Sequence, residues 1–217
     1  MLSATTESTT GEARVTSLAH DPRRPGCLRV GVQGGALFAV PAEVVRRLGL
    51  EKGSRLGPGA GRELEAAADA EAALRTALRC LARRPFARRD LAGRLRMKGH
   101  PPAAAEAAVG RAAELGLIDD EAFARQYVES RFARGRGPAR LRRELIQLGV
   151  EPALVEGLLA DAIPQHRAGE RMLALARKRA SQLQGLQREE RLRRVVAYLA
   201  RRGFTGPQVR RTVRELV

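Results

Sequence analysis

A leucine-to-glycine segment occurs three times along the chain at nearly constant spacing. The three copies end at Gly99, Gly149 and Gly203, so successive glycines lie 50 and 54 residues apart. Eight positions before each glycine stands an aliphatic residue: Leu91, Leu141 and Val195. A repeat of this length is typical of tandem helical units, each too small to bury its apolar face without a neighbour. The spacing therefore predicts a helical array, and with it an extended binding surface rather than an enzyme.

Local signals divide each repeat into three helices. Glycine after an apolar stretch is typical of a helix end, and proline is typical of a first helical turn. Leu74, Leu78 and Leu81 follow the i, i+4, i+7 spacing of one helix face, so they predict the apolar side of a first helix that ends before Pro85. We expect the other helices over residues 88–98, 101–116, 123–132, 138–148, 152–159, 170–184, 189–202 and 206–217.

Residues 13–57 carry the signals of a small β-hairpin followed by a short helix. Two apolar stretches flank the turn residues Gly34 and Gly35, and Pro41 suits the first position of a helix that Gly49 ends. The glycines do not predict a phosphate-binding loop, since no helix follows them directly. We expect strands over residues 27–32 and 36–40 and a helix over 42–48. This module either caps the first repeat or binds a partner of its own.

These signals together predict a mainly α-helical chain. Three tandem three-helix repeats would form an elongated, curved array, and the small β-hairpin-plus-helix module would precede them. The first residues are rich in Ser and Thr, and glycines and prolines cluster before the first repeat. We therefore expect a disordered tail over residues 1–12, the module over 13–57, a linker over 58–69, and repeats over 70–118, 119–163 and 164–217.

Positive charge is concentrated in the repeats. The chain carries a net charge of +16, yet residues 1–70 hold nine basic and eight acidic side chains, whereas residues 71–217 hold 31 and 16. Such an excess indicates a polyanionic partner such as nucleic acid or a nucleoprotein. The alternative is a solvated helix surface shaped by genome composition, because 37 of the 40 basic residues are arginine.

Catalytic and metal-binding patterns are missing from the sequence. His20, His100 and His166 are scattered, and no nucleotide-binding loop or nucleophile motif occurs. Asp119 and Asp120 are adjacent acids at an expected helix start, where they suit a cap better than a metal site. The two cysteines lie far apart, and neither a signal peptide nor a membrane span is recognisable. We expect a cytoplasmic protein that is not an enzyme and has no cofactor or metal.

Arginines provide the candidate binding site. Arg136, Arg140 and Arg143 follow i, i+4, i+7 spacing, which predicts a basic stripe along one helix side. The planar guanidinium fork suits phosphate. Aromatic residues make up only 3% of the chain and mostly fit core positions, so stacking of single-stranded bases is not expected. The candidate residues are Arg83, Arg84, Arg88, Arg89, Arg134, Arg136, Arg140 and Arg143.

Several segments, in order, resemble the RecX family. Residues 77–85 are similar to the opening of its first repeat, and residues 115–124 are similar to its most distinctive stretch. Residues 134–138, with Leu141 and Glu144, match the pattern of the second repeat. The resemblance covers about residues 70–217. It is looser in the third repeat, where Gly206-Pro207 replaces a simple proline, and the module before the repeats resembles an extension found in only part of the family.

The resemblance implies a regulator of the RecA recombinase. Members of the family bind the filament that RecA forms on DNA and dampen its ATP hydrolysis, strand exchange and coprotease activity. We accordingly expect a monomer whose partners are the RecA filament and, through backbone contacts of weak sequence preference, DNA. Two alternatives remain open: a DNA-binding transcriptional regulator, and a non-specific architectural DNA-binding protein.

Overall fold

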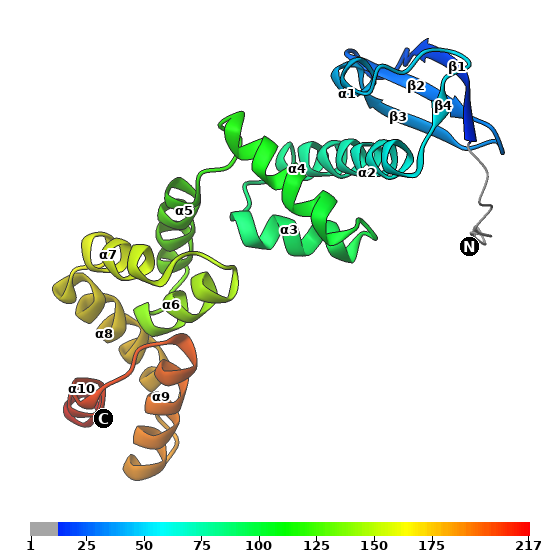
Figure 1. Cartoon of the computed structure of the whole chain (residues 1–217). Coiled ribbons are helices and arrows are strands. Elements are labelled where there is room, and N and C mark those ends of the chain that lie inside the picture. Colours follow the sequence, from blue (N-terminus) through cyan, green and yellow to red (C-terminus); the bar gives the residue numbers. More distant parts are fainter. Residues whose placement is uncertain (1–12) are drawn as a thin grey trace. The chain divides into compact units, whose positions relative to one another are not determined.

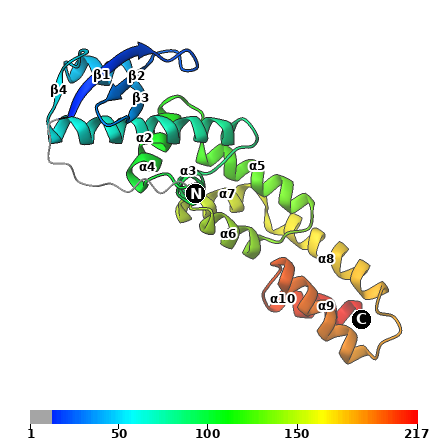
Figure 2. The ribbon, with the colours of Figure 1, turned by 90° about the vertical axis from the view of Figure 1, so that its right-hand side faces the viewer.

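The computed structural model describes residues 13–217 (Figures 1 and 2), so the tail expected over residues 1–12 lies outside the described residues. The chain divides into two compact units. Of the described residues, the first comprises 13–82 together with Ala92–Glu114, and the second comprises Arg83–Leu91 together with Leu115–Val217. Each unit has a hydrophobic core of its own.

A four-stranded antiparallel sheet opens the first unit. Its order is β3-β2-β1-β4, and helix α1 (Ala42–Arg47) follows β3. The expected hairpin is present as β2 and β3, and Gly34 and Gly35 in its turn have φ angles of 96° and 88°, which glycine adopts without strain. Pro41 ends β3 and precedes α1 rather than starting it. The strands are β1 (Ala13–His20), β2 (Cys27–Val32), β3 (Leu37–Pro41) and β4 (Arg55–Leu56).

Strands β1 and β4 were not expected. In β1, polar and apolar residues are mixed and Val15 alone is buried, so no alternating pattern marks the strand. The strand forms because its backbone pairs with β2 along nearly its whole length, and β4 adds only two residues to its other edge. Strand β1 therefore depends on pairing with the next strand, and β4 depends on pairing with a segment distant in sequence, rather than on alternating patterns of their own.

Helix α2 (Pro58–Leu81) corrects the expected linker. Residues 58–69 form its first half, which starts after Gly57 with proline in the first turn. Figures 1 and 2 show this half lying against the sheet, where Leu64 is fully buried with Val30 and Val40. The glycines in its first turn weaken the local helix signal, but burial of Leu64 compensates.

The second half of α2 packs on α4 (Pro102–Glu114) through alanines. Ala73 and Ala77 on α2 are fully buried, as is Ala105 on α4. Leu78, expected in the core, is 38% exposed, and Leu74 and Leu81 are only partly buried. Small alanine side chains allow the two helix backbones to approach closely, so the alanine face forms the contact. The leucine face lies beside this contact and is only partly buried.

The second unit consists of helices. Figure 1 shows α8 beside α9 and α10, in agreement with their contacts. Its core contains the aliphatic residues that recur in the sequence, and Leu141, Leu145, Val195 and Leu199 are all fully buried. The helices are α5 (Asp120–Ala133), α6 (Pro138–Gln147), α7 (Pro152–Ala162), α8 (Gln165–Ser181), α9 (Arg188–Arg202) and α10 (Pro207–Leu216). Helix α3 (Arg88–Met97) contributes its first residues to this unit and the rest to the first.

The repeated glycines end the middle helix of each repeat in the same way. Gly99, Gly149 and Gly203 have φ angles of 90°, 85° and 91°. Each glycine N–H donates to the carbonyl three residues earlier, and the next N–H donates to the carbonyl five residues before it. This pair of bonds is the Schellman motif, and it confirms the helix ends expected from the sequence. The described residues thus form a mainly α-helical protein of three three-helix repeats preceded by a small strand module.

Candidate functional site

The acidic residues between the first and second repeats cap helices, as expected. Asp119 accepts a hydrogen bond from the N–H of Ala122 at 2.9 Å, which caps α5. Asp120 accepts one from the N–H of Arg88 at 2.7 Å, so it caps the start of α3 as well. The second bond is a tertiary contact that holds the first turn of α3 against the start of α5. It therefore fixes the place of Arg88 in the second unit.

The eight candidate arginines fall into two groups. Five have exposed side chains for which no hydrogen bond, ion pair or ring contact exists among the described residues. They lie before or in the first turn of α3, at the end of α5, and on α6. These five are Arg83, Arg88, Arg89, Arg134 and Arg143. Their charge is available to a ligand without the loss of an existing contact.

The other three candidates already have partners. Arg84 places its Cζ atom 3.6 Å from the centre of the Phe86 ring, and its Nη2 lies 3.5 Å from Asp90 Oδ2. Arg136 and Arg140 both bind Glu144. The expected stripe therefore does not present three free guanidinium groups. Arg136 precedes the first residue of α6, so helical spacing does not govern its direction.

Glu144 is the centre of a half-buried polar cluster. Its Oε2 accepts from Arg136 Nη1 at 2.6 Å and from Tyr127 Oη at 3.0 Å, and its Oε1 accepts from Arg140 Nε at 2.8 Å. Burial alone would raise the pKa of Glu144, but hydrogen bonds from Arg140, Arg136 and Tyr127 outweigh it, and the pKa is lowered. Burial raises the pKa of Tyr127, and the hydrogen bond to the Glu144 carboxylate raises this pKa further. The carboxylate is therefore charged and the phenol protonated at neutral pH.

Sequence reasoning missed Glu144 and Tyr127 as partners of the arginines. Glu144 stands four residues after Arg140 on the same helix, which is the spacing of a helical ion pair and could have indicated that contact. Nothing local indicated Tyr127, which lies 17 residues before Glu144 on another helix.

The start of α6 meets the end of α9 directly. The N–H of Gly137 donates to the carbonyl of Arg202 at 2.6 Å, and the N–H of Ala139 donates to that of Gly203 at 3.2 Å. In addition, Arg202 Nη1 donates a hydrogen bond of 3.3 Å to the carbonyl of Arg134, in the segment before α6. Unsatisfied N–H groups of one helix thus bind unsatisfied carbonyls of another, and the two helix dipoles lie end to end.

Glycine provides the space for such junctions. A Cβ atom on Gly137 would lie 2.5 Å from the carbonyl oxygen of Gly203, and one on Gly203 would lie 2.3 Å from Cβ of Arg140. The same holds one repeat earlier, where a Cβ on Gly149 would lie 2.3 Å from Cβ of Arg89. The repeated glycine therefore ends one helix and also admits the start of the middle helix of the preceding repeat.

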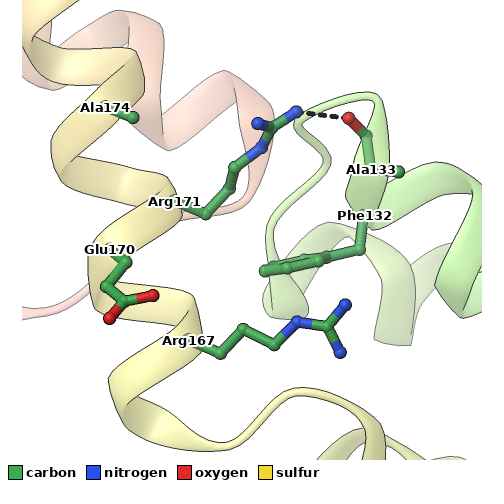
Figure 3. A pocket seen from close by; sticks show the side chains of 6 residues that line it. All are labelled: Phe132, Ala133, Arg167, Glu170, Arg171 and Ala174. Atoms are coloured by element: carbon green, nitrogen blue, oxygen red, sulfur yellow. Dashed lines mark hydrogen bonds between the residues drawn. The ribbon is translucent and has the colours of Figure 1, made fainter.

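A hollow of about 360 Å³ lies between α5 and α8, where Arg167 and Arg171 lie on either side of Phe132 (Figure 3). Arg171 donates to the carbonyl of Ala133, the last residue of α5. Arg167 donates to the last carbonyl of α7 at 2.8 Å, and Glu170 adds a carboxylate to the lining. Both cations thus already satisfy helix ends, whose carbonyls disfavour an anion. The arginines of this hollow therefore hold helices together and are not candidates for binding an anion.

The described residues contain no group of three or more His, Cys, Asp or Glu side chains that could hold a metal ion. Among the same residues, no helix is both long and apolar enough to span a membrane. Cys27 and Cys80 are buried and free.

Comparison with known proteins agrees with this arrangement. Three domain models of one family match the chain: the first three-helix domain of RecX over residues 73–111, the second over 119–159, and the third over 169–213. The chain is 41% identical over 146 residues to the regulatory protein RecX of Halorhodospira halophila, covering 67% of this chain and 89% of the relative. It is also 41% identical over 140 residues to RecX of Streptomyces lividans, covering 64% and 73%.

Two solved structures share the fold. A crystal structure of regulatory protein RecX superimposes with a TM-score of 0.72 at 22% identity, covering 94% of this chain and 99% of the other. RecX from Lactobacillus salivarius superimposes with a TM-score of 0.59 at 20% identity, covering 68% and 96%. The domain matches and the relatives together identify the chain, which belongs to the RecX family of regulatory proteins.

Proposed function

We propose that this chain binds the filament that the RecA recombinase forms on DNA and inhibits its ATP hydrolysis, strand exchange and coprotease activity. The observation that carries the proposal is the group of five exposed, partner-free arginines on a chain of the RecX family. A nucleoprotein filament offers regularly spaced phosphates, and linked repeats with several weak contacts gain avidity on such a ligand. The chain would act as a monomer, in the cytoplasm.

The partner-free arginines are the proposed contacts with the filament. Arg83, Arg88, Arg89, Arg134 and Arg143 can each form a bidentate contact with phosphate without breaking an ion pair. Arg136 and Arg140 contribute mainly through the contacts with Glu144 that they already make, and Arg84 remains stacked on Phe86. Residues of the third repeat, such as Arg177, Arg193 and Arg210, are exposed in the same way and extend the cationic surface.

The test is DNA-dependent ATP hydrolysis by the cognate recombinase, titrated with this protein at physiological salt. We expect inhibition at amounts well below one molecule per recombinase protomer, because each bound molecule affects a filament rather than a single subunit. Inhibition that begins only when the protein saturates the DNA would indicate simple competition for DNA. An unchanged rate at every ratio would overturn the proposal.

Binding to DNA alone is the second candidate function, and the net charge of +16 favours it. A non-specific architectural protein would bind duplex DNA equally tightly with and without recombinase. A transcriptional regulator would protect one defined sequence from nuclease digestion. The two outcomes separate these alternatives from the filament regulator.

A further inference from the structure

A second hollow, of about 570 Å³, lies along one face of α5. Phe123, Tyr127 and Leu148 contribute aromatic and apolar surface to its lining, and Arg84 and Arg131 contribute positive charge. Its α5 residues recur at the i, i+3, i+4, i+7, i+8 spacing of a single helix face. We call this hollow the α5 groove; all of its lining residues belong to the second unit.

The two arginines of the α5 groove lie against aromatic rings. Arg131 has its Cζ atom 5.3 Å from the centre of the Tyr127 ring, and its side chain makes no hydrogen bond with the described residues. Arg84 lies closer to Phe86, at 3.6 Å; its Nη1 donates to the carbonyl of Pro85 at 3.1 Å, and its contact with Asp90 is long at 3.5 Å. Stacking holds a guanidinium plane in place but leaves its N–H edge free to donate. Both arginines therefore keep donors for an anionic group.

The aromatic part of the lining is held in place before any ligand binds. Tyr127 Oη donates to Glu144 at 3.0 Å and accepts from Arg136 Nη1 at 3.2 Å. The Phe123 and Tyr127 rings pack with their centres 5.9 Å apart. Binding of a ligand therefore requires little loss of conformational entropy in these side chains, which favours binding.

We propose that the α5 groove docks an extended protein segment that combines acidic with large apolar side chains. The proposal rests on the proposed function, in which the recombinase filament supplies that segment. Carboxylates would pair with Arg84 and Arg131, and an apolar side chain would cover Leu148 and the Tyr127 ring edge. Charge complementarity beside apolar surface of this kind is typical of peptide recognition.

Nucleic acid fits the α5 groove less well. Bases bind proteins by stacking on exposed ring faces. Here Arg131 covers a face of Tyr127, and Phe123 is only 8% exposed. The apolar lining would also gain nothing from a phosphate backbone. The groove therefore favours a protein segment over a DNA strand.

The first test compares Arg131→Ala with Arg125→Ala. Arg125 lies on the same helix, outside the groove, and pairs with Glu121 at 2.9 Å, so its removal changes the net charge equally. We expect Arg131→Ala to weaken binding to the recombinase–DNA filament about fivefold to tenfold, while affinity for the same DNA without recombinase stays unchanged. Arg125→Ala should leave both affinities unchanged. An equal loss on naked DNA, or no loss on the filament, would overturn the proposal.

The second test identifies the occupant. A photo-crosslinking benzoylphenylalanine replaces Gln126, which is exposed and lines the groove. On the recombinase–DNA filament we expect crosslinks to the recombinase polypeptide, and crosslinks to DNA would overturn the proposal. Failure of the unmodified chain to bind the filament would instead refute the proposed function, and the groove proposal would fail with it.

Discussion

At the scale of single residues, arginines of equal formal charge differ in whether that charge is already paired with a carboxylate. Arg142 and Arg143 are neighbours on α6, yet Arg142 pairs with Glu156 at 2.6 Å whereas Arg143 has no partner among the described residues. Both side chains are exposed, and each substitution removes one positive charge. The pair therefore separates a direct contact from the effect of net charge alone.

Arg143→Ala should weaken binding to the filament and to DNA, because one phosphate contact is lost. For the same reason, the slope of the logarithm of the binding constant against the logarithm of the salt concentration should become shallower by about one. Arg142→Ala should have a smaller effect, since its charge is already partly neutralised. Fluorescence anisotropy over a salt series measures both values. Equal losses from the two variants would show that net charge, rather than a contact by Arg143, determines the affinity.

Glu144 is the residue on which the polar cluster of the second repeat depends. Glu144→Gln should destabilise the protein by about 1–3 kcal/mol, because Arg136 and Arg140 lose a charged acceptor while they remain half-buried. Glu156→Gln removes an exposed ion pair with Arg142 and should cost at most about 0.5 kcal/mol. Urea unfolding measures both free energies, and similar small losses would contradict a structural role of the cluster.

The pH dependence of the Glu144 variant has a defined sign. Because folding lowers the pKa of Glu144, the unfolded chain binds more protons in the acidic range, and stability rises with pH. The stabilisation is complete above the usual pKa of 4.5 and is lost as the pH falls through the lowered value. The difference between the native chain and Glu144→Gln should therefore shrink in acid. A constant difference would contradict the charged state of Glu144.

At the scale of helices, the end of one middle helix accommodates the start of another. Gly99 and Gly203 have nearly the same φ angle, but of these two glycines only Gly203 packs directly against a neighbouring helix. An added Cβ at Gly99 meets nothing within 4 Å, whereas at Gly203 it meets Arg140. The two glycines therefore separate the cost of a left-handed residue from the cost of a blocked junction.

Gly99→Ala should cost about 1–2 kcal/mol, the strain of alanine in a left-handed conformation. Gly203→Ala should cost more, by about 1–3 kcal/mol, because the overpacked contact also displaces the start of α6. Gly157→Ala is the control, since this position lies within α7 with open space around it and should gain about 0.5–1 kcal/mol. Equal losses at Gly99 and Gly203 in urea unfolding would show that the junction tolerates a side chain.

At the scale of the whole molecule, the distribution of charge suits a repetitive polyanion. Residues 1–70 are almost neutral, whereas the repeats hold 31 basic against 16 acidic side chains. Covalent linkage makes each further contact intramolecular, so several weak arginine–phosphate contacts add up to strong binding. The expectation of inhibition below one molecule per protomer belongs to this scale, because it requires one chain to act on a filament and not on an isolated subunit.

The sequence by itself determined the repeats, their helix ends and their buried aliphatic positions. These features depend on glycine, proline and apolar residues within a few positions of one another, so local physics suffices to predict them. It also identified the resemblance to the RecX family. Of the candidate site, it named the arginines but did not indicate which of them have partners in the fold.

Only the tertiary structure decided the rest. Strand β4 depends on pairing with β1, the first half of α2 depends on burial of Leu64, and α2 packs through alanines instead of leucines. Likewise Arg140 bonds to the carbonyl of Arg201, 61 residues away, as well as to Glu144. Such contacts join segments distant in sequence, and their energies depend on which groups the fold brings within hydrogen-bonding distance. For that reason, no local pattern could distinguish the free arginines from the bound ones.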